Sequence, residues 1–474
     1  MKIRIIILFI LAFITLKAQD YVSVDFNTPK VTSKYHYSLL QKQKEDKIPT
    51  LLSFHPNTFL FDKAYDDYKS FMYYKTKNAY IASKYKLGVS HSADKGDYQY
   101  FYGAEIFGNI SDKIFIYSDW WKVQFPNDIK NPDTPLMDSW TEKNAIDNSR
   151  TVISYKNKNL SLSVGRSKYQ IGSNISGSVI LSDVSNDYGY FSSKFNIGKV
   201  GISFIHASVI PDSINPDYNS VGSFSKKYED KYFVLHKIDW NGDNLHIFIG
   251  ETVVYGSRSI DVNYLLPIAF LRAIEHDLAD RDNAFMFGGF DWTFKEHNTL
   301  YLNVNIDDLS KATIFTSFWG NKYAAQLGYQ KRIKKLILTN ETTAVRPWMY
   351  THKRLVNKFS NDKMPLGYPN GSNIIQNSTE VSYDFSKKLQ VAAYYGIAKQ
   401  GSEGNNFSIN YLQIHDLAGA KCKWLNGDIS LLQNIKLSAD WTFLNYNRLH
   451  IALEYNKKDD EKNTELSIEY QIKI

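Results

Sequence analysis

The sequence predicts an all-β protein: a transmembrane, antiparallel, up-and-down β-barrel of about 18 strands behind a short N-terminal periplasmic helical segment. Three observations predict this fold. Apolar and polar residues alternate through most of the 474 residues, short and long connections alternate between these runs, and the chain begins with an export signal.

Composition excludes several other classes of protein. Aromatic residues make up 15% of the chain, which is too many for a disordered or collagen-like protein. The one cysteine, Cys422, excludes a disulfide framework and a zinc site built on cysteines. The net charge of +7 is weak and dispersed, so it does not indicate a nucleic-acid partner.

Residues 1–18 have the pattern of a signal peptide. Lys2 and Arg4 precede an apolar run, Ile5–Leu16, and a plausible cleavage site follows Ala18. The run is too short to cross a bilayer of about 30 Å as a helix, and no later apolar run is long enough. We therefore expect an exported protein whose membrane spans, if it has any, are β-strands.

The next segment, residues 19–75, differs from the rest of the chain. Tyr35–Lys47 is mostly polar with a few apolar positions, and Pro49 and Pro56 interrupt the chain after it. We interpret this segment as a periplasmic part with one short helix, and residues 76–474 as the outer-membrane barrel with long external loops.

Strict alternation is clearest in Leu300–Asp307 and again at the end of the chain, in Glu465–Ile474. Successive side chains of a strand point to opposite faces, so each run has one apolar and one polar face. A β-sandwich would show the same alternation. These runs are about 10–12 residues long, however, which suits tilted membrane strands better than sandwich strands of about 5–6 residues.

The connections between the runs alternate in length. The short ones lie near residues 109–111, 156–159, 198–199, 241–242, 295–298, 332–334, 386–388 and 444–445. The long ones lie near residues 124–148, 167–186, 211–230, 256–282, 308–320, 347–376 and 399–432. Outer-membrane barrels have short periplasmic turns and long external loops, so we expect every long link outside and every short turn inside.

One long link carries residues that suit a sugar ligand. Arg346, Trp348, Tyr350 and His352 follow each other at every second position. Aromatic faces stack on the C–H surfaces of sugars, and arginine recognises carboxylate or phosphate groups with two parallel hydrogen bonds. These four residues are the first candidates for glycan binding. The alternative is that the arginines fix a plug inside the barrel.

The link at residues 256–282 combines the apolar run Leu265–Ala273 with a crowd of charges, so we expect it to fold into the lumen or pack on the rim. It supplies the second set of candidates, as plug or lumen positions: Glu251, Tyr255, Arg258, Arg272, Glu275, Asp282 and Asn283. His276-Asp277 invites a metal or hydrolase interpretation, but no further ligands appear at metal-site spacing. We therefore predict no metal and no cofactor.

Several short motifs resemble those of one family. They are GETVVYG (250–256), NYLLP (263–267), Glu275-His276, DNAF (282–285), NIDDL (305–309), VRPWMY (345–350), PLGYPN (365–370), the Tyr35–Leu40 region and His55-Pro56. Together, in their order along the chain, they resemble the Bacteroidetes branch of the Wzi capsule-assembly family, which includes gliding-motility outer-membrane proteins of the RemB type.

The resemblance implies an 18-stranded outer-membrane barrel that binds or anchors capsule or exopolysaccharide in a lectin-like manner. It offers no catalytic residues, and the sequence has no Gly-x-Ser-x-Gly nucleophile motif, so we predict no enzyme. The expected partners are surface or extracellular polysaccharide, outer-membrane lipid and envelope proteins. Three alternatives remain: a diffusion porin, a gliding or secretion accessory protein, and a barrel enzyme.

Overall fold

The computed structural model describes residues 72–75, 79–92, 97–111, 113–124, 145–211, 229–295, 297–309, 313–314, 316–386, 388–415, 421–443 and 447–473. The predicted signal peptide and the predicted helix at Tyr35–Lys47 lie outside the described residues. The short strand β1 (Met72–Lys75) belongs to the segment that we assigned to the N-terminal part, and it pairs with the first barrel strand.

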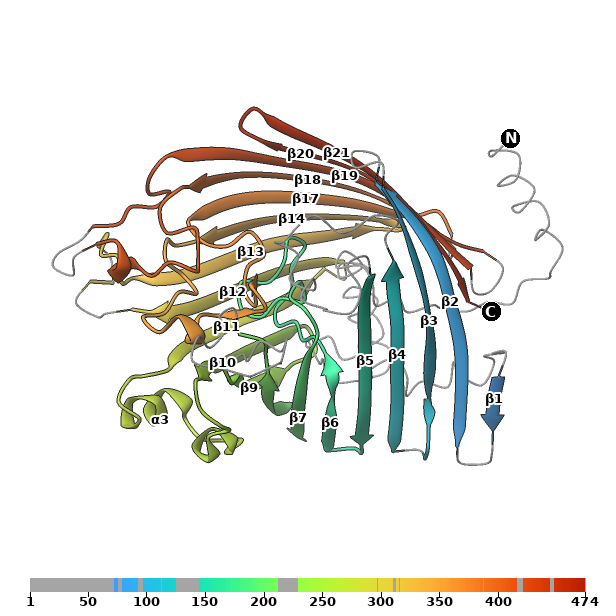
Figure 1. Ribbon diagram of the computed structural model, residues 1–474, viewed down its shortest axis with the longest axis horizontal. Helices are drawn as coiled ribbons and strands as arrows, with labels where there is room; N and C mark the ends of the chain where they lie inside the picture. The colour runs from blue at the N-terminus through green and yellow to red at the C-terminus, as the bar shows by residue number, and fades with distance from the viewer. Residues whose placement is uncertain are drawn as a thin grey trace, which may run out of the picture.

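One sheet holds nineteen strands, and eighteen of them form the predicted antiparallel barrel (Figure 1). They are β2 (Tyr80–Ser92), β3 (Asp97–Asn109), β4 (Ile114–Gln124), β5 (Ala145–Lys156), β6 (Leu160–Ser167), β7 (Tyr188–Ile197), β8 (Val200–Ser208), β9 (Lys231–Asn241), β10 (Leu245–Gly256), β11 (Asn283–Phe294), β12 (Asn298–Asp308), β13 (Lys322–Ile333), β14 (Leu336–Val345), β17 (Ile374–Asp384), β18 (Leu389–Gly401), β19 (Ile429–Phe443), β20 (Asn447–Lys458) and β21 (Glu461–Lys473).

Each strand pairs with its neighbours in the chain, and the last strand pairs with the first. At this seam β21 meets β2 at Lys86↔Lys473 and Leu87↔Ile472. β1 pairs with an earlier part of β2, from Tyr80 to Ser83. One edge of β2 therefore pairs both with β1, which precedes the barrel strands, and with β21, the last of them.

All eight predicted short turns join strands at one end of the barrel, which confirms them. The opposite end carries the predicted long links, but it also carries two short ones, between Ser92 and Asp97 and between Lys458 and Glu461. The expectation that every short turn lies at the periplasmic end is therefore wrong for these two. A hairpin needs only about two loop residues, so the length of one connection does not fix its end.

The two faces of the wall differ as a membrane barrel requires. On β12 the inward residues Tyr301, Asn303, Asn305 and Asp307 are buried, while the alternate apolar residues from Leu300 to Ile306 are partly exposed on the outside. An apolar outer face and a polar inner face are what a wall between lipid and a filled lumen needs. Within the described residues, no helix is both long and apolar enough to cross a membrane.

Two long loops fold inward and form a plug, which we define as residues 168–187 and 346–373. Ile171 and Leu181 form a β-bridge inside the first loop, and the second contains η5 (Leu355–Asn357) and a hairpin of β15 (Ser360–Asn361) and β16 (Met364–Pro365). Buried plug residues such as Val179, Leu181, Tyr350 and Tyr368 share one core with inward residues from β5 around to β18. The inward side chains of β5 to β18 face one another across the lumen, so the plug core fills the lumen at their level.

Candidate functional site

A cavity of about 560 Å³ lies between the plug and the wall strands β17–β21. Its volume is in the range of small-molecule binding sites. Twenty-two residues line it, and seven of them are carboxamides: Asn174, Asn370, Gln376, Gln433, Asn434, Asn456 and Asn463. A carboxamide both donates and accepts hydrogen bonds, so this lining suits a ligand with many hydroxyl groups.

Two side-chain networks hold these amides in place. In the first, Asn370 Nδ2 donates to Gln376 Oε1 at 2.7 Å, and Gln376 Nε2 donates to Tyr394 Oη at 3.1 Å. In the second, Asn434 Nδ2 donates to Glu454 Oε1 at 2.8 Å and also to Asn456 Oδ1. The plug and the wall both contribute, so the site exists only when the plug is folded into the lumen.

The cavity reaches the long-loop end of the barrel, because its lining includes Lys458, Glu461 and Lys462, which flank the turn between β20 and β21. Its charged lining residues balance: three lysines (Lys457, Lys458, Lys462) face three acids (Asp183, Glu454, Glu461). The site therefore has no strong preference for an anionic or a cationic ligand from net charge alone.

Arg346, a first-set candidate, lies buried where three loops meet. Its guanidinium donates to the carbonyls of Asn321 (3.1 Å), Phe318 (3.4 Å) and Cys422 (3.0 Å). It also lies over the ring of Trp424, 5.3 Å from the centroid. Five N–H donors in a fixed plane suit this convergence of carbonyls. Arg346 thus joins the loops to each other, and its side chain is 3% exposed.

Trp348 and Tyr350 are also buried, and both have left-handed backbone conformations (φ 67° and 72°), which is unusual for bulky residues. Trp348 packs edge-on against Tyr411, which belongs to η6 (Tyr411–Gln413). Tyr350 Oη donates to the carbonyl of Val179 at 2.8 Å and so joins the two halves of the plug. The surrounding contacts hold the strained turn in place.

His352, the fourth first-set candidate, is only partly buried and lies beside Arg354, whose backbone N–H donates to its Nδ1. Burial, with the positive charge of Lys322 nearby, lowers the pKa of His352 to about 4. The imidazole is therefore neutral at physiological pH. The structure brings the four first-set residues together as part of the plug and not as one solvent-facing surface.

The second set, apart from Asn283, lies on the other side of the wall. Along β10, Phe248 and Val254 belong to the plug core, while Ile247 and Ile249 are exposed on the outer face. Side chains alternate between faces, so Glu251 and Tyr255 point outward with the isoleucines. The prediction that Glu251 and Tyr255 face the lumen is therefore wrong. The register of β10 with β9 and β11 places both residues on the outer face.

Residues 257–282, which we call the outer segment, cover these outward side chains. The segment contains η4 (Val262–Leu265) and α3 (Leu271–Asp277), and Figure 1 shows α3 at the periphery of the molecule beside β9 and β10. Leu271 and Tyr264 of the segment share a buried cluster with outward residues such as Val234 and Val253. The long link thus packs against the outside of the barrel, at its rim.

Ion pairs account for the other second-set residues. Arg258 binds Asp282 with two hydrogen bonds, of 2.9 and 2.6 Å, and Tyr264 Oη donates to the same carboxylate. Asn283 is the first residue of β11 and lies opposite the inward residue Val254. Its Nδ2 donates to the carbonyl of Asn357 at 3.0 Å, so Asn283 faces the plug as expected. Arg272 Nη1 lies 3.5 Å from Glu275 Oε2. Buried charges are paired, as low polarity requires.

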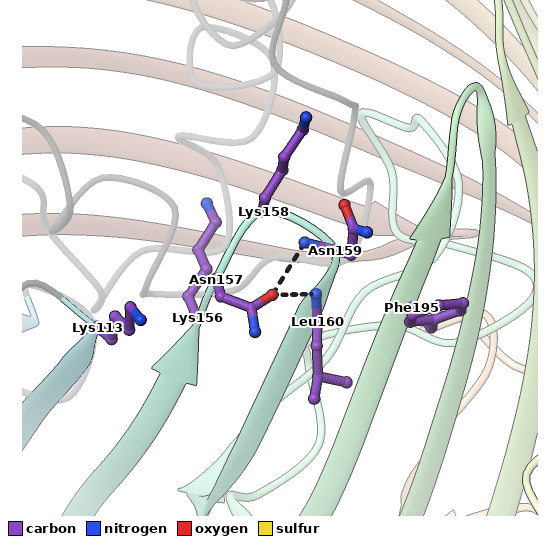
Figure 2. A pocket seen from close by; sticks show the side chains of 7 residues that line it. All are labelled: Lys113, Lys156, Asn157, Lys158, Asn159, Leu160 and Phe195. Carbon is purple, nitrogen blue, oxygen red and sulfur yellow. Dashed lines mark hydrogen bonds between the residues drawn. The ribbon is translucent and has the colours of Figure 1, made fainter.

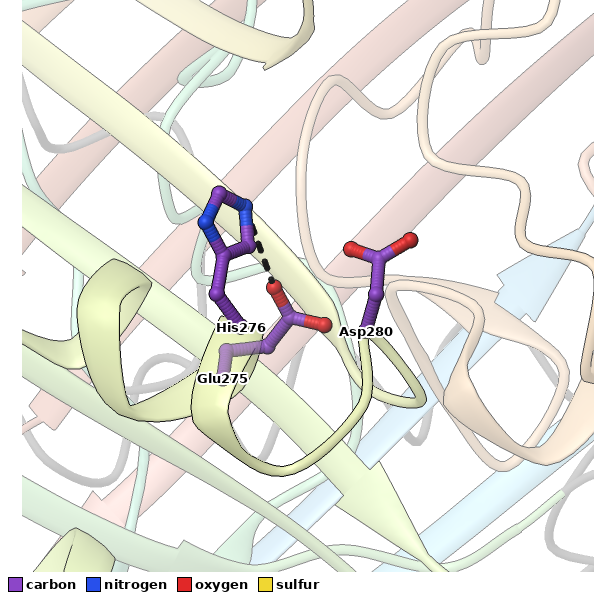
Figure 3. A group of neighbouring side chains, drawn as sticks. All are labelled: Glu275, His276 and Asp280. Carbon is purple, nitrogen blue, oxygen red and sulfur yellow. Dashed lines mark ion pairs between the residues drawn. The ribbon is translucent and has the colours of Figure 1, made fainter.

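Figure 3 shows Glu275 with His276 and Asp280, whose ligating atoms lie within 4.8 Å of one another. Burial, strengthened by the like charge of Asp280, raises the pKa of Glu275 to about 7. Such a trio could hold a divalent cation, but Arg272 already compensates the buried carboxylate. The geometry therefore supports a shared proton and an ion pair at this point as well as it supports a metal.

The opposite end of the barrel carries a second, shallower pocket, shown in Figure 2. Its lining consists of Lys113, Lys156, Asn157, Lys158, Asn159, Leu160 and Phe195. Asn157 Oδ1 accepts the backbone N–H groups of Asn159 (2.9 Å) and Leu160 (2.8 Å), which fixes the short β5–β6 turn. The pocket is therefore a feature of the turns at this rim, far along the strands from the carboxamide cavity.

None of the seven cavity carboxamides was among the candidates predicted from the sequence. Gln376, Asn434 and Asn456 are ordinary inward positions of strands, and every barrel has many of these. An available signal was the density of carboxamides on β17, β19 and β20 beside the plug motif Pro365–Asn370. Pairing of that motif with the distant wall could not be deduced from either stretch alone.

No family model matches the sequence, and the search of curated proteins finds no match. The fold resembles solved outer-membrane barrels. One is Wzi from Escherichia coli, an outer-membrane protein involved in group 1 capsule assembly and described as a carbohydrate-binding β-barrel, with a TM-score of 0.60, 11% identity, and coverage of 93% of this chain and 98% of that one.

Two Pseudomonas aeruginosa outer-membrane proteins are more distant. OccK3 gives a TM-score of 0.47 at 8% identity and covers 84% of this chain and 96% of its own, and OpdK gives 0.48 at 8% identity and covers 84% and 99%. The expected likeness to Wzi is thus confirmed at the level of the fold. The chain has the fold of an outer-membrane β-barrel, with its lumen plugged by its own loops.

Proposed function

We propose that the protein is an outer-membrane barrel that binds surface or extracellular polysaccharide without catalysis, through the carboxamide cavity. The observation that carries the proposal is that cavity: about 560 Å³, lined by seven carboxamides and reaching the long-loop end. Sugar hydroxyls donate and accept hydrogen bonds, and carboxamides can satisfy both functions at once. Location in the outer membrane follows from the apolar outer face and the fold of the wall.

Two further features support binding over free diffusion. The plug core fills the lumen between β5 and β18, whereas a diffusion porin needs an open aqueous channel. The cavity amides are also held by fixed networks, which lowers the entropy that a ligand must overcome. Arg346, Trp348 and Tyr350 then act as positioning residues that keep the plug and loops in the shape that forms the cavity.

The proposal extends the resemblance to Wzi from fold to function. In one version of the proposal, the chain anchors capsule or exopolysaccharide. In the other, as for a gliding-motility protein of the RemB type, the same cavity binds an external glycan and the result is adhesion. The balanced charge of the lining favours a neutral or zwitterionic repeat unit.

The test compares two double variants of the full chain in binding to the polysaccharide extracted from the cells that make the protein. Asn434→Ala with Asn456→Ala removes two cavity amides, and we expect at least a tenfold weaker binding, since about 1.4 kcal/mol is tenfold. The matched control is Asn263→Ala with Asn406→Ala, which removes two exposed amides outside the cavity lining.

Equal binding by both double variants and the wild type would place the ligand elsewhere. Absence of binding by the wild type, with ion conductance in planar bilayers, would favour the porin alternative instead. Co-purification with envelope proteins and no glycan binding would favour the gliding or secretion accessory.

A further inference from the structure

The outer segment, residues 257–282, has two faces, and only one of them is explained by its contacts with the barrel. The covered face packs on outward side chains of β8–β11 through Tyr264 and Leu271. The other face carries large apolar side chains whose exposed fractions are 40% at Leu265, 53% at Leu266, 82% at Ile268 and 58% at Phe270. Ile260 (49%) and Val262 (73%) extend this surface.

The covered face hides polar groups that the barrel would otherwise present to lipid. Glu251 points outward from β10, and its carboxylate accepts the backbone N–H groups of Leu271 (2.7 Å) and Arg272 (3.2 Å), the first residues of α3. His236, outward on β9, pairs with the carbonyl of Ala269 at 2.9 Å. His206 pairs with Tyr255 at 2.8 Å. Polar groups in a hydrocarbon layer need such partners, because no water is available there.

Charges of the segment that lie near the wall are neutralised in the same way, while His276, Asp277 and Asp280 at the end of the segment are exposed. The guanidinium of Arg258 binds both oxygens of Asp282, and Asp261 lies 3.4 Å from both Arg258 and Arg281. Exposed ion pairs contribute little in water, whereas Arg258, Asp261 and Asp282 form their pairs while largely buried beneath the segment. Paired charges beneath an apolar exterior are the arrangement expected where the surroundings have low polarity.

The exposed face of the segment continues the outer surface of the wall. Ile249 on β10 (61% exposed) and Met286 on β11 (48% exposed) point outward below the segment on the strands that it joins. The segment connects the ends of β10 and β11 at the long-loop rim, so it lies at the level of the external leaflet. An apolar patch of this extent on a soluble surface would mark a contact site.

We propose that residues 260–270 of the outer segment lie within the acyl-chain layer of the external leaflet, as an amphipathic element mounted on the wall, with lipid as the partner of their exposed apolar face. The exposed charges at His276, Asp277 and Asp280 mark the side of the segment that faces water. Continuity with the apolar outer face of the barrel selects lipid over a protein partner. The inference rests on immersion of the barrel in a membrane and not on the glycan proposal, so either can fail without the other.

The experiment measures collisions of a spin label with oxygen, which is enriched in lipid, and with a nickel chelate, which is confined to water. The full chain with Ile268→Cys is labelled and placed in vesicles of phosphatidylethanolamine and phosphatidylglycerol. Cys422 is 1% exposed, and burial raises the pKa of its thiol, so the wild type should take up no label. Ile249→Cys is the lipid reference. Lys423→Cys, on an exposed part of the loop between β18 and β19, is the water reference.

We expect residue 268 to match residue 249, with frequent oxygen and rare nickel collisions. Nickel collisions as frequent as at residue 423 would overturn the proposal, because the segment would then face water. Rare collisions with both reagents would also overturn it, because a second copy of the chain would then cover the patch. If Ile268→Cys fails to insert, Leu266→Cys gives the same test at a neighbouring position of the same face.

Discussion

The plug and the outer segment are both long connections at the same end of the barrel, yet one folds into the lumen and the other onto the outer wall. The plug buries apolar residues among inward side chains, as Tyr350 does beside Phe285 and Phe359. The outer segment buries Tyr264 and Leu271 against outward side chains and leaves a second apolar face exposed. The plug thus has its apolar side chains in one shared core, whereas the outer segment has a second apolar face, which we propose lies against lipid.

The two regions also treat polar groups differently. The plug leaves a cavity in which amides remain positioned for a ligand, whereas the outer segment saturates Glu251, Arg258 and Asp282 with protein partners. The candidate site is thus the region where polar side chains, held by hydrogen bonds, line a cavity and not a packed interface. Variants that disturb one of the two regions and leave the other intact test this difference.

The largest expected effect is at the plug. Tyr350→Ala removes a fully buried ring that stacks on Phe359 and a hydroxyl bonded to the carbonyl of Val179. We expect the free energy of unfolding in urea to fall by about 3–5 kcal/mol. Tyr383→Ala, which removes a tyrosine from the exposed outer face, is the control and should have a much smaller effect. Similar losses in both variants would mean that the plug adds nothing to stability.

The next effect separates a positioning role of Arg346 from direct ligand contact. Arg346→Leu leaves the carbonyls of Asn321, Phe318 and Cys422 without this donor, and we expect a loss of about 1.5–3 kcal/mol in unfolding free energy together with weaker glycan binding. Arg354→Leu, at an exposed position, is the matched control. Binding that is lost at unchanged stability would instead indicate direct contact with the ligand.

A smaller effect is expected where the outer segment joins the wall. Glu251→Ala removes the acceptor for the first two backbone N–H groups of α3, which should weaken local docking by about 0.5–2 kcal/mol. The readout is the rate of trypsin cleavage at Arg258, Arg272 and Arg281 while the barrel stays intact. Glu461→Ala, which removes an exposed carboxylate outside the segment, is the control. Unchanged cleavage would show that apolar packing alone holds the segment.

The smallest effect depends on pH. Because the pKa of Glu275 is raised from 4.5 to about 7 by burial and by Asp280, the folded segment keeps a proton that the unfolded chain has released between these values. Stability is therefore greatest below about pH 4.5, falls as pH rises towards 7, and is level above it. Trypsin cleavage of the segment should increase over the same window.

Glu275→Gln removes the titrating group at nearly the same size, so its cleavage should no longer vary across that window. The wild type and the variant are compared in the same vesicles, so that any pH dependence of trypsin itself cancels. A pH dependence that persists in Glu275→Gln would assign the effect to another group.

Much of the wall could be predicted from the sequence, because period-two alternation directly reports which side chains share a face. The run Leu300–Asp307 became β12 with the predicted faces, and the eight short turns join strands as expected. The short turns at Ser92–Asp97 and Lys458–Glu461 escaped the length rule, since that rule concerns averages and a hairpin can be short at either end.

The site could not be predicted to the same depth. Alternation ends where a strand ends, so nothing local tells whether Arg346 or Trp348 faces solvent or other loops. Glu251 is an outward acid on a lipid-facing strand, and only the presence of α3 above it makes that position acceptable. The cavity depends on plug residues such as Asn174 lying beside β19 and β20, and their distance along the chain conceals this.

The seam of the barrel has a consequence for assembly. β21 reaches β2 only from Lys86 and Leu87 onward, and β1 supplies the partners for Tyr80 to Ser83. The cylinder therefore becomes complete only when a short stretch ahead of the wall and the last strand have both docked on one edge. When strands add in chain order, the edge of β2 at Lys86 and Leu87 stays unpaired until β21 arrives, so the closing ladder is the last one to form.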